Sequence, residues 1–268
     1  FDAAAVSNGK CLNNAILPGP ELQREISDVL LRFRRAPVAL SADIAQMLLQ
    51  VKLKEEDPPY HRFLWRNLKE DQPPDIYEFL RLPFGNTASP FWAQYVLYTN
   101  ARSNASTYHE ATNTVENSMY VDDVLDSTET THDAIVLRRQ LSQMLGGAGF
   151  ALRKLLSNKA EVIQNVPVAE RLHGVDIPDG NLPSQKTRGV LWKPQDDAFA
   201  FNVEHLQKPE LMTKRTVLSK IAAIFDPLKL LAPFTVRAKV IMQEIWMAGV
   251  EWDELLPDEL CAKWKAWI

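Results

Sequence analysis

Apolar residues recur at helical spacing in the first half of the chain. Between residues 19 and 36, Leu22, Ile26, Val29 and Phe33 are three or four positions apart, which predicts an amphipathic helix. Two further helices are predicted: one with Ser89 as its N-cap and Pro90 at its first position, and one from about Thr131 that buries Leu137, Leu141 and Met144 and ends at Gly146-Gly147.

Short apolar runs bounded by proline, glycine or polar residues predict the strands. The run after Pro37 is apolar up to Asp43, and the segments after Pro58-Pro59 and Pro73-Pro74 predict the two strands of a hairpin. The segment "NSMYVDDVLDS" (117–127) predicts a strand, a turn and a second strand. Further strands are predicted within 149–156 and 160–166, and a hairpin over 189–204.

A helical pattern replaces the mixed one after Lys208. An apolar stripe from Leu211 to Phe225 predicts a helix that ends before Pro227, and two more helices follow from about Pro233 and Pro257. The sequence therefore predicts an α+β part, residues 1–204, and a helical part, residues 205–268.

Composition limits the class of protein. With 268 residues, 46% of them hydrophobic, the chain can form a large core, as one big domain or two modest ones. It holds no apolar run near the roughly 18 residues of a membrane span, and no signal peptide. Two distant cysteines and five histidines without HxxxH spacing predict neither a disulfide framework nor a zinc site. We expect an intracellular fragment of a longer protein that does not enter a membrane.

Charge is distributed unevenly along the chain. The net charge of −4 argues against a protein that coats nucleic acid nonspecifically. From Lys208 to Lys239, however, there are seven basic residues and two acids, a local charge of +5. A solvated helix face and a surface that contacts phosphates are both consistent with this run.

Two adjacent acids, Asp122 and Asp123, stand inside an apolar run, between Tyr120-Val121 and Val124-Leu125. Neighbouring side chains of one strand face opposite ways, so both carboxylates reach one place only from a tight turn. A second acidic pair, Asp196-Asp197, follows a polar segment and predicts a plain turn.

Two such carboxylates need a counter-charge. At about 5 Å they repel by about 3 kcal/mol at an effective dielectric of about 20, and Mg²⁺ is a cation that hard oxygen ligands suit. Two-metal phosphoryl chemistry also needs an acid from a second segment, and Asp43, at the end of an apolar strand, qualifies. The alternative is a structural turn, with Asp43 as a helix N-cap.

Five motifs follow one another: the strand that ends at Asp43, "LPFGNTASPFWAQ" (82–94), "YVDD" (120–123), "GFALRK" (149–154) and "RGVLW" (188–192). This order resembles that of the retroelement reverse transcriptases. The tail "TKRTVLSKIAAIFDPLKLLAPFTVRAKVIMQEIW" resembles the Bel/Pao family of long-terminal-repeat retrotransposons, as do "FDAAAVSNGKCLNNAILPGPEL" and "ADIAQMLLQVKL". The resemblance covers essentially the whole chain.

The resemblance implies a right-hand polymerase fold: incomplete fingers and a palm with a ferredoxin-like β-sheet and flanking helices in residues 1–204, then a helical thumb or connection in 205–268. It implies that Asp43 and Asp122 hold two Mg²⁺ ions (or Mn²⁺), that Asp123 is the third catalytic acid and that the Ile44 carbonyl is a further metal ligand. The metals would activate the primer 3′-hydroxyl, clamp the dNTP triphosphate and stabilise the departing pyrophosphate.

The resemblance also implies binding sites for nucleotide and template. Phe84 and Gly85 would lie close to the incoming nucleotide, because glycine allows close backbone approach. A Pro-Gly turn is the structural alternative. Lys154, or Lys159 in its place, would lie near the triphosphate, unless it is a solvated strand lysine. The implied set of nucleotide and template residues is Leu48, Phe84, Gly85, Tyr120 and Lys154.

A primer site is implied for the later hairpin. Gly189, Val190, Leu191 and Trp192 would grip the primer end, and the alternative is a core hairpin with a packed tryptophan. The basic run would belong to the thumb and touch phosphates without sequence readout.

Three departures from the family pattern stand out. Leu48 replaces the aromatic residue that usually blocks the ribose 2′-hydroxyl, which leaves sugar discrimination open. Lys229 replaces the glycine of the family's "DPLGLL". The basic finger residues that hold the triphosphate should precede Phe1.

The combined prediction is the reverse transcriptase region of a Bel/Pao retrotransposon, an RNA-directed DNA polymerase that adds dNTPs to a primer on an RNA or DNA template. The protease, RNase H and integrase of the polyprotein are expected outside this chain, and cytoplasmic virus-like particles are the expected location. The alternatives are a decayed copy that binds primer–template without catalysis and another palm-fold nucleotidyl enzyme such as a cyclase.

Overall fold

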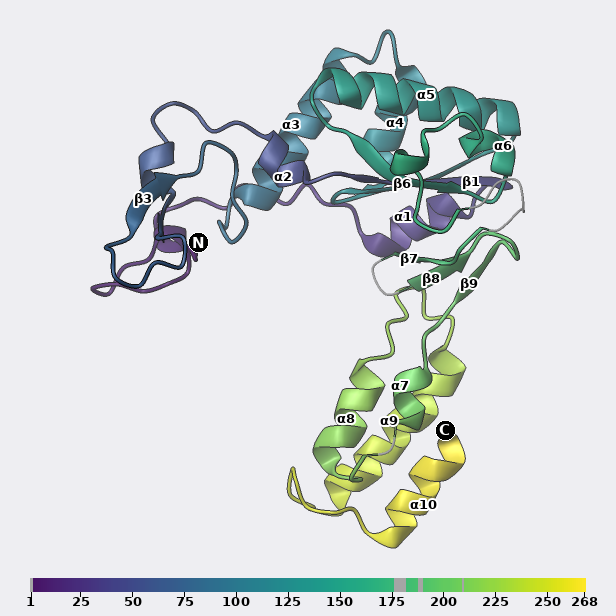
Figure 1. The fold of residues 1–268 in the computed structure, drawn as a ribbon. Coiled ribbons are helices and arrows are strands. Elements are labelled where there is room, and N and C mark those ends of the chain that lie inside the picture. Colours follow the sequence, from purple (N-terminus) through teal and green to yellow (C-terminus); the bar gives the residue numbers. More distant parts are fainter. Residues whose placement is uncertain (1, 176–181, 188–189, 209) are drawn as a thin grey trace. The chain divides into compact units, whose positions relative to one another are not determined.

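The computed structural model describes residues 2–175, 182–187, 190–208 and 210–268 (Figure 1). The chain forms two compact units, Phe1–Asn181 and Leu182–Ile268. The predicted boundary between palm and thumb, at 204/205, lies inside the second of these units and stays a prediction.

A four-stranded antiparallel sheet, in the order β4–β5–β1–β6, forms the centre of the first unit. Its strands are β1 (Val38–Ile44), β4 (Met119–Tyr120), β5 (Asp123–Thr128) and β6 (Leu152–Ser157). β1 is an inner strand, and six of its seven residues are buried, which explains its nearly continuous apolar sequence. Since helices separate β1 from β4 and β5 from β6, the order is the ferredoxin-like arrangement that the resemblance implied.

Helices lie on both faces of this sheet (Figure 1). One face carries α3 (Ser89–Ser103), α4 (His109–Asn117), α5 (Thr131–Gly147) and the short α6 (Ala160–Ile163). The other face carries α1 (Ile26–Phe33), which buries Val29, Leu30 and Phe33 against the sheet.

Adjacent residues of β5 show which side chains point to which face. Ser127 Oγ donates to the Arg32 carbonyl in α1 at 2.8 Å. Asp126 points the other way, where its carboxylate accepts from Thr114 Oγ1 of α4 at 2.6 Å. Because side chains alternate along a strand, Asp123 lies on the same face as Ser127, the face of α1.

Two helix starts differ from the predictions. The first helix begins at Ile26 rather than near residue 19, because the backbone is extended just before it: Glu25, the N-cap, has a ψ of 135°. Ser89 lies inside α3, one residue after the N-cap Ala88, and its Oγ donates to the Pro83 carbonyl at 2.7 Å.

Two other helices, α6 and α4, were not predicted, because their sequences show no helical periodicity of apolar residues. The predicted strand at 160–166 is the helix α6, because the adjacent Val162 and Ile163 are both buried and fit either element. The helix α4 was not predicted, since only Ala111 and Val115 among its nine residues are apolar. Its buried face is completed by threonines.

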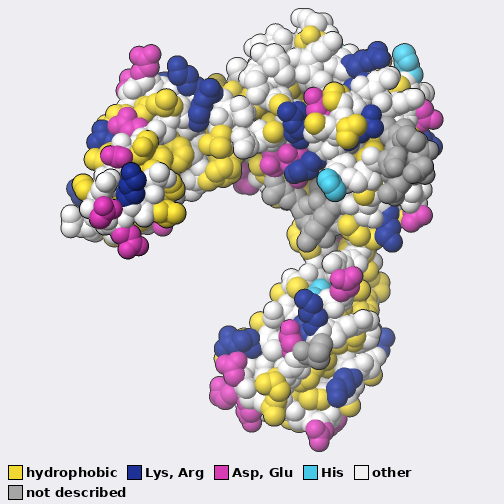
Figure 2. Space-filling model, viewed as in Figure 1, with side chains coloured by type: hydrophobic (Ala, Val, Ile, Leu, Met, Phe, Trp, Pro, Cys, Tyr) yellow, Lys and Arg dark blue, Asp and Glu magenta, His cyan; other side chains and the backbone are white. Residues whose placement is uncertain are grey.

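The rest of the first unit carries the hairpin of β2 (Arg62–Trp65) and β3 (Asp75–Glu78), as the two proline pairs predicted. Its paired residues Leu64 and Ile76 are 65% and 67% exposed, and Figure 2 shows hydrophobic side chains at the surface of this lobe. The short helices are α2 (Met47–Gln50) and the 3-10 turns Leu12–Asn14, Pro58–Tyr60 and Val168–Glu170.

The second unit joins a small sheet to a helical bundle. Its strands are β7 (Gln185–Thr187), β8 (Val190–Lys193) and β9 (Ala198–Ala200), of which β7 was not predicted. Its helices are α7 (Glu204–Gln207), α8 (Lys214–Ala222), α9 (Ala232–Met247) and α10 (Asp258–Trp267). Val217, Ile245 and Trp264 are fully buried at the centre of the bundle. Across the described residues, no helix combines the length and apolar character that crossing a bilayer requires.

Candidate functional site

Two of the predicted acids face each other across the central strands. β1 and β5 pair with Asp43 opposite Asp123, so their side chains are direct cross-strand neighbours on one face of the sheet. Such neighbours have Cβ atoms about 4.5–5.5 Å apart. The sheet register therefore places these carboxylates together although 80 positions separate them in the sequence.

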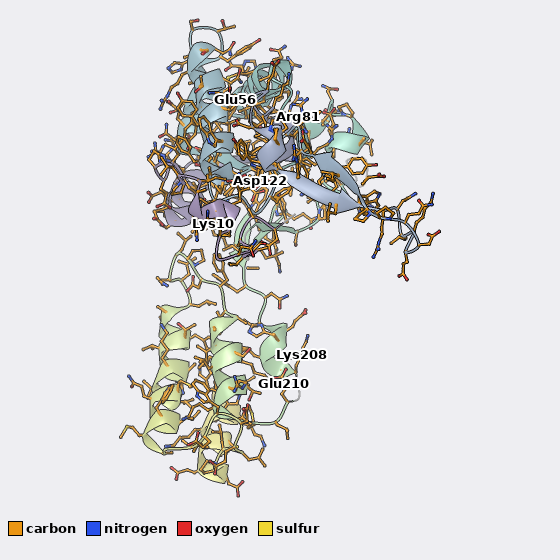
Figure 3. The ribbon with its side chains drawn as sticks, turned by 90° about the vertical axis from the view of Figure 1, so that its left-hand side faces the viewer. Lys10, Glu56, Arg81, Asp122, Lys208 and Glu210 are labelled. Carbon is orange, nitrogen blue, oxygen red and sulfur yellow. The ribbon has the colours of Figure 1, made fainter. Side chains whose placement is uncertain are left out.

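The third acid lies in the turn between β4 and β5 (Figure 3). Tyr120 pairs with Asp123, so Val121 and Asp122 form a two-residue hairpin loop. Val121 has a φ of +57°, a positive value at the first loop position only, as in a type II′ turn. A β-branched residue there stores about 1–3 kcal/mol of strain, which the buried flanks hold in place.

Backbone hydrogen bonding joins this turn to the end of β1. The Ile44 amide donates to the Asp122 carbonyl at 2.8 Å. The backbone segments that carry Asp43, Asp122 and Asp123 therefore meet at one end of the sheet, and the catalytic role of the three acids stays a prediction. The Ile44 side chain is fully buried, and a metal-ligand role for its carbonyl stays a prediction.

Lys154 of β6 is the cation of this acidic centre. Its Nζ donates to Asp43 Oδ2 at 2.9 Å, and it has a φ of +54° beside an irregularity in the β1–β6 pairing. The hydrogen bond to Asp43 is the largest effect that raises the pKa of Lys154, and the charges of Asp43, Asp123 and Asp122 raise it further. The Lys154 ammonium therefore interacts electrostatically with all three carboxylates.

The carboxylates of Asp43, Asp122 and Asp123 are suitable ligands for a hard divalent cation, but their side chains are not arranged as a coordination shell in this structure. Within the residues that the structure describes, no three His, Cys, Asp or Glu side chains are grouped closely enough to hold a metal ion. Asp43 is instead engaged by Lys154. Carboxylate oxygens are ligands that a hard divalent cation such as Mg²⁺ prefers.

The segment Leu82–Asn86 presents two of the predicted nucleotide residues outward. Leu82 and Pro83 are buried, Phe84 is 62% exposed, and Gly85 is exposed with a φ of +88°. Asn86 turns inward again and is 7% exposed. The predicted Pro-Gly turn is present, and it displays Phe84 and Gly85 at the surface.

Leu48, at the position where the family pattern has an aromatic residue, is connected to this segment through backbone hydrogen bonds. It is partly buried in α2, and its carbonyl accepts from the Val51 amide at 3.1 Å. The Val51 carbonyl accepts in turn from the Leu82 amide at 2.9 Å. The two predicted nucleotide segments are therefore neighbours.

Three adjoining hollows follow residues 18–35 along the first unit. Their volumes are about 180, 550 and 480 Å³; the first two share Glu21–Gln23, and the last two share Arg24. Arginines, aromatic rings and acids line them: Arg24, Arg32, Arg35 and Arg102, with Phe91, Tyr95 and Tyr98 and the acids Glu21, Asp28 and Glu116. Arg102 is paired with Glu116 at 2.7 Å. This groove was not predicted, because its arginines are dispersed among acids in the sequence.

The predicted primer-binding hairpin is a well-packed one. Val190 and Trp192 are 3% and 1% exposed, and Leu191 is partly exposed; Gly189 lies outside the described residues. Trp192 Nε1 donates to Asp197 Oδ1 at 3.4 Å across the turn. The pair Asp196-Asp197 is thus the plain turn that was predicted, and the primer role of 189–192 stays a prediction.

The basic run of the second unit is only partly exposed. Lys214 lies with its Nζ 4.4 Å from the centre of the Trp246 ring, and Lys220 Nζ donates to the Leu206 and Lys208 carbonyls at 3.1 and 2.6 Å. Both lysines are nearly buried, and Arg215 pairs with Asp253 at 2.7 Å. The exposed bases of the run are Lys208, Arg215, Lys229, Arg237 and Lys239, of which Arg215 is paired with Asp253.

Comparison with known families agrees with this geometry. A profile described as reverse transcriptase (RNA-dependent DNA polymerase) matches residues 5–166, more than half of the chain. The chain belongs to the reverse transcriptase family. A second profile, described as a Pao retrotransposon-like RNaseH-like domain, matches residues 213–268 and identifies the Bel/Pao branch.

The Bel/Pao reverse transcriptase shares its fold with three structures of the foamy viral protease-reverse transcriptase. The structure in complex with dsDNA has a TM-score of 0.59 and 15% identity, covering 94% of this chain and 45% of that chain. The dRH form in complex with ds DNA has a TM-score of 0.58 and 13% identity, covering 93% of this chain and 37% of that chain. The complex with RNA/DNA hybrid has a TM-score of 0.56 and 12% identity, covering 91% of this chain and 28% of that chain. The chain therefore spans less than half the length of each structure.

Residues 213–268 are relevant to the prediction that RNase H lies outside the chain. The profile that matches residues 213–268 carries an RNaseH-like name, and those residues form the helices α8, α9 and α10. In this structure they are a helical continuation of the second unit, so their role as thumb stays a prediction.

Proposed function

We propose that the chain catalyses template-directed DNA synthesis, adding dNTPs to a primer 3′-hydroxyl. The convergence of Asp43, Asp122 and Asp123 at one end of the sheet carries this proposal. Family membership supports it, because RNA-dependent DNA polymerisation is the activity after which the matching profile is described.

The acids would hold Mg²⁺ through Asp43, Asp122 and Asp123, with Ile44 as a further ligand by its carbonyl. When bound, the ions supply charge stabilisation for the triphosphate and activation of the primer hydroxyl. Asp43 has to exchange its bond to Lys154 for this role. The raised pKa of Lys154 keeps it charged at neutral pH, so that it could then pair with an anionic triphosphate.

Other residues of the chain would position the substrates. Phe84 and Gly85 are displayed at the surface beside the Leu48 segment, where an incoming nucleotide could contact exposed backbone and an aromatic ring. The groove along residues 18–35 offers arginines for phosphates and aromatic rings for bases, the two features that hold single strands. We assign the template to this groove and the primer end to the hairpin 189–192.

Primer extension tests the proposal with a matched pair of variants. Asp122→Asn should abolish Mg²⁺-dependent extension, because one carboxylate of the acidic centre is neutralised. Asp196→Asn makes the same chemical change in the other Asp-Asp pair and should extend the primer at the wild-type rate. Equal extension by wild type and Asp122→Asn would contradict the assignment.

A second candidate function is binding of primer–template without catalysis. The ion pair of Asp43 with Lys154 favours it, because Lys154 already supplies a counter-charge at the place where catalysis needs a metal ion. Tight primer–template binding by a wild-type chain that shows no extension with either Mg²⁺ or Mn²⁺ would select this function over the first.

A further inference from the structure

The displayed loop Leu82–Asn86 is held from its outer side by a residue far away in sequence. Asn13 Nδ2 donates to the Gly85 carbonyl at 3.0 Å, and Asn13 Oδ1 accepts from the Thr87 amide at 2.9 Å. Both of these hydrogen bonds are exposed to solvent, so water can replace Asn13 at both groups. This contact alone does not fix the loop.

A buried pair holds the same loop from its inner side. His61 and Asn86 are 6% and 7% exposed, and His61 Nε2 lies 2.9 Å from Asn86 Nδ2. The Asn86 carboxamide cannot be turned round, because its Oδ1 already accepts from the Ala88 amide at 2.9 Å at the start of α3.

The hydrogen-bond inventory then settles the form of the histidine. The amide nitrogen of Asn86 can only donate, so His61 Nε2 must accept and its proton must be on Nδ1. His61 Nδ1 lies 3.0 Å from the Asp57 carbonyl, which is the acceptor that this tautomer needs. This tautomer is compatible with all three of these side-chain contacts.

The pair links two parts of the first unit that the sequence separates. His61 precedes β2, and its backbone carbonyl accepts from the Phe79 amide after β3 at 3.1 Å. Asn86 ends the loop that turns Phe84 and Gly85 outward and begins the approach to α3. The position of the β2–β3 hairpin is thereby transmitted to the loop through one buried bond.

We propose that His61 is a positioning residue for nucleotide binding: through Asn86 it fixes the outward display of Phe84 and Gly85. The proposal rests on the proposed polymerase function. Without the imidazole, a buried donor of Asn86 is unpaired, and such a donor costs enough that the loop should move to satisfy it. A nucleotide would then meet a loop that is ordered only when it binds.

Three variants separate positioning from a loss of structure. His61→Leu removes both ring hydrogen bonds. His61→Gln keeps an acceptor for Asn86 at similar reach, since the Gln carbonyl can stand near the place of Nε2. Thr112→Val is the control: Thr112 is also 7% exposed and its Oγ1 donates to the Ala101 carbonyl at 2.9 Å, a buried bond between α4 and α3.

The first measurement is amide hydrogen exchange of residues 82–89, which needs no activity. Exchange in this segment should quicken in His61→Leu, and should match wild type in His61→Gln and Thr112→Val. Unchanged exchange in His61→Leu would overturn the proposal whatever the enzyme does.

The second measurement is the dNTP dependence of primer extension. His61→Leu should raise KM for dNTP about tenfold, equivalent to about 1.4 kcal/mol, with kcat within about twofold, and His61→Gln should restore most of the loss. An equal rise in Thr112→Val, or a fall in kcat alone, would show a general structural effect and overturn the positioning role. If wild type extends no primer, the proposed function fails, and hydrogen exchange still decides whether His61 holds the loop.

Discussion

Lys229 occupies a backbone conformation that suits glycine. It lies in the turn between α8 and α9 with a φ of +59°, at the position where the family pattern "DPLGLL" has Gly. A side chain in this left-handed region costs about 1–2 kcal/mol, which glycine avoids. Glycine in turn has more conformational entropy in the unfolded chain, which lowers the free energy of unfolding by about 0.5–1 kcal/mol. We therefore expect Lys229→Gly to raise the free energy of unfolding by about 0.5–1 kcal/mol.

The hydrogen bonds of the turn leave the Lys229 side chain out of this balance. The Asp226 carboxylate accepts from the Leu230 and Leu231 amides at 3.0 and 2.7 Å, and the Lys229 backbone bonds to Asp226 and Ala232. All of these bonds involve backbone groups or Asp226, so the substitution should keep them.

Thermal unfolding of the chain, followed by calorimetry, measures the effect. For a unit of this size, 1 kcal/mol corresponds to a shift of about 4–8 °C in Tm, so a rise of several degrees is expected in the transition of the second unit. Lys208→Gly is the matched control, because Lys208 has an ordinary φ of −62° and should lose stability. Lys229→Ala isolates the charge. A lower Tm for Lys229→Gly, or an equal gain in Lys229→Ala, would refute the conformational argument.

Three further predictions follow from single contacts. Lys220→Met should lower the free energy of unfolding by about 2 kcal/mol in urea titrations, because the buried Leu206 carbonyl and the partly buried Lys208 carbonyl lose a charged donor, and a loss below about 0.5 kcal/mol would contradict this. Arg24→Ala should weaken primer–template binding and reduce its salt dependence by about one unit of slope, whereas Arg139→Ala, exposed on α5, should leave both unchanged. The pKa of Lys154 is raised in the folded state above its usual value of 10.5. Its pair with Asp43 therefore stabilises the fold fully at pH values below 10.5, and this stabilisation is lost as the pH rises through the folded-state pKa. The small stability difference between wild type and Lys154→Gln should therefore shrink in alkaline urea titrations, and a difference that grows would reverse the sign of this argument.

The elements that the sequence predicted best are those in which one signal decides the structure. β1 is an unbroken apolar run, the β2–β3 hairpin has a proline pair before each strand, and α5 has both a stripe and a terminal glycine pair. α4 and α6 lacked such a signal: threonines fill the buried face of α4, and two adjacent apolar residues in α6 fit helix and strand alike. The Thr114 hydroxyl is buried because it donates to Asp126. A pattern of hydrophobic and polar residues counts such a threonine as polar and therefore misses the buried face of the helix.

The candidate site divides in the same way. The acids were predictable because an apolar frame around a charged pair is uncommon, and the register of β1 and β5 then brings Asp43 to Asp123. The ion pair with Lys154 was not predictable in its geometry, since it depends on a positive φ and an irregular pairing within β6. The clamp of His61 on Asn86 depends on two residues 25 positions apart whose types suggest an ordinary loop.

The basic run of the second unit shows why spacing is a better guide than charge. Lys214 and Lys220 stand three positions before and after the fully buried Val217, which places all three on one side of α8. Their burial follows from that spacing: one ammonium rests on the Trp246 ring and the other caps backbone carbonyls. The two lysines therefore hold the bundle together, and Arg215 is engaged by Asp253. Contacts with phosphates from this run then come from five exposed bases rather than seven, and one of the five, Arg215, already has an acidic partner. The salt dependence that the run can contribute to binding is correspondingly lower.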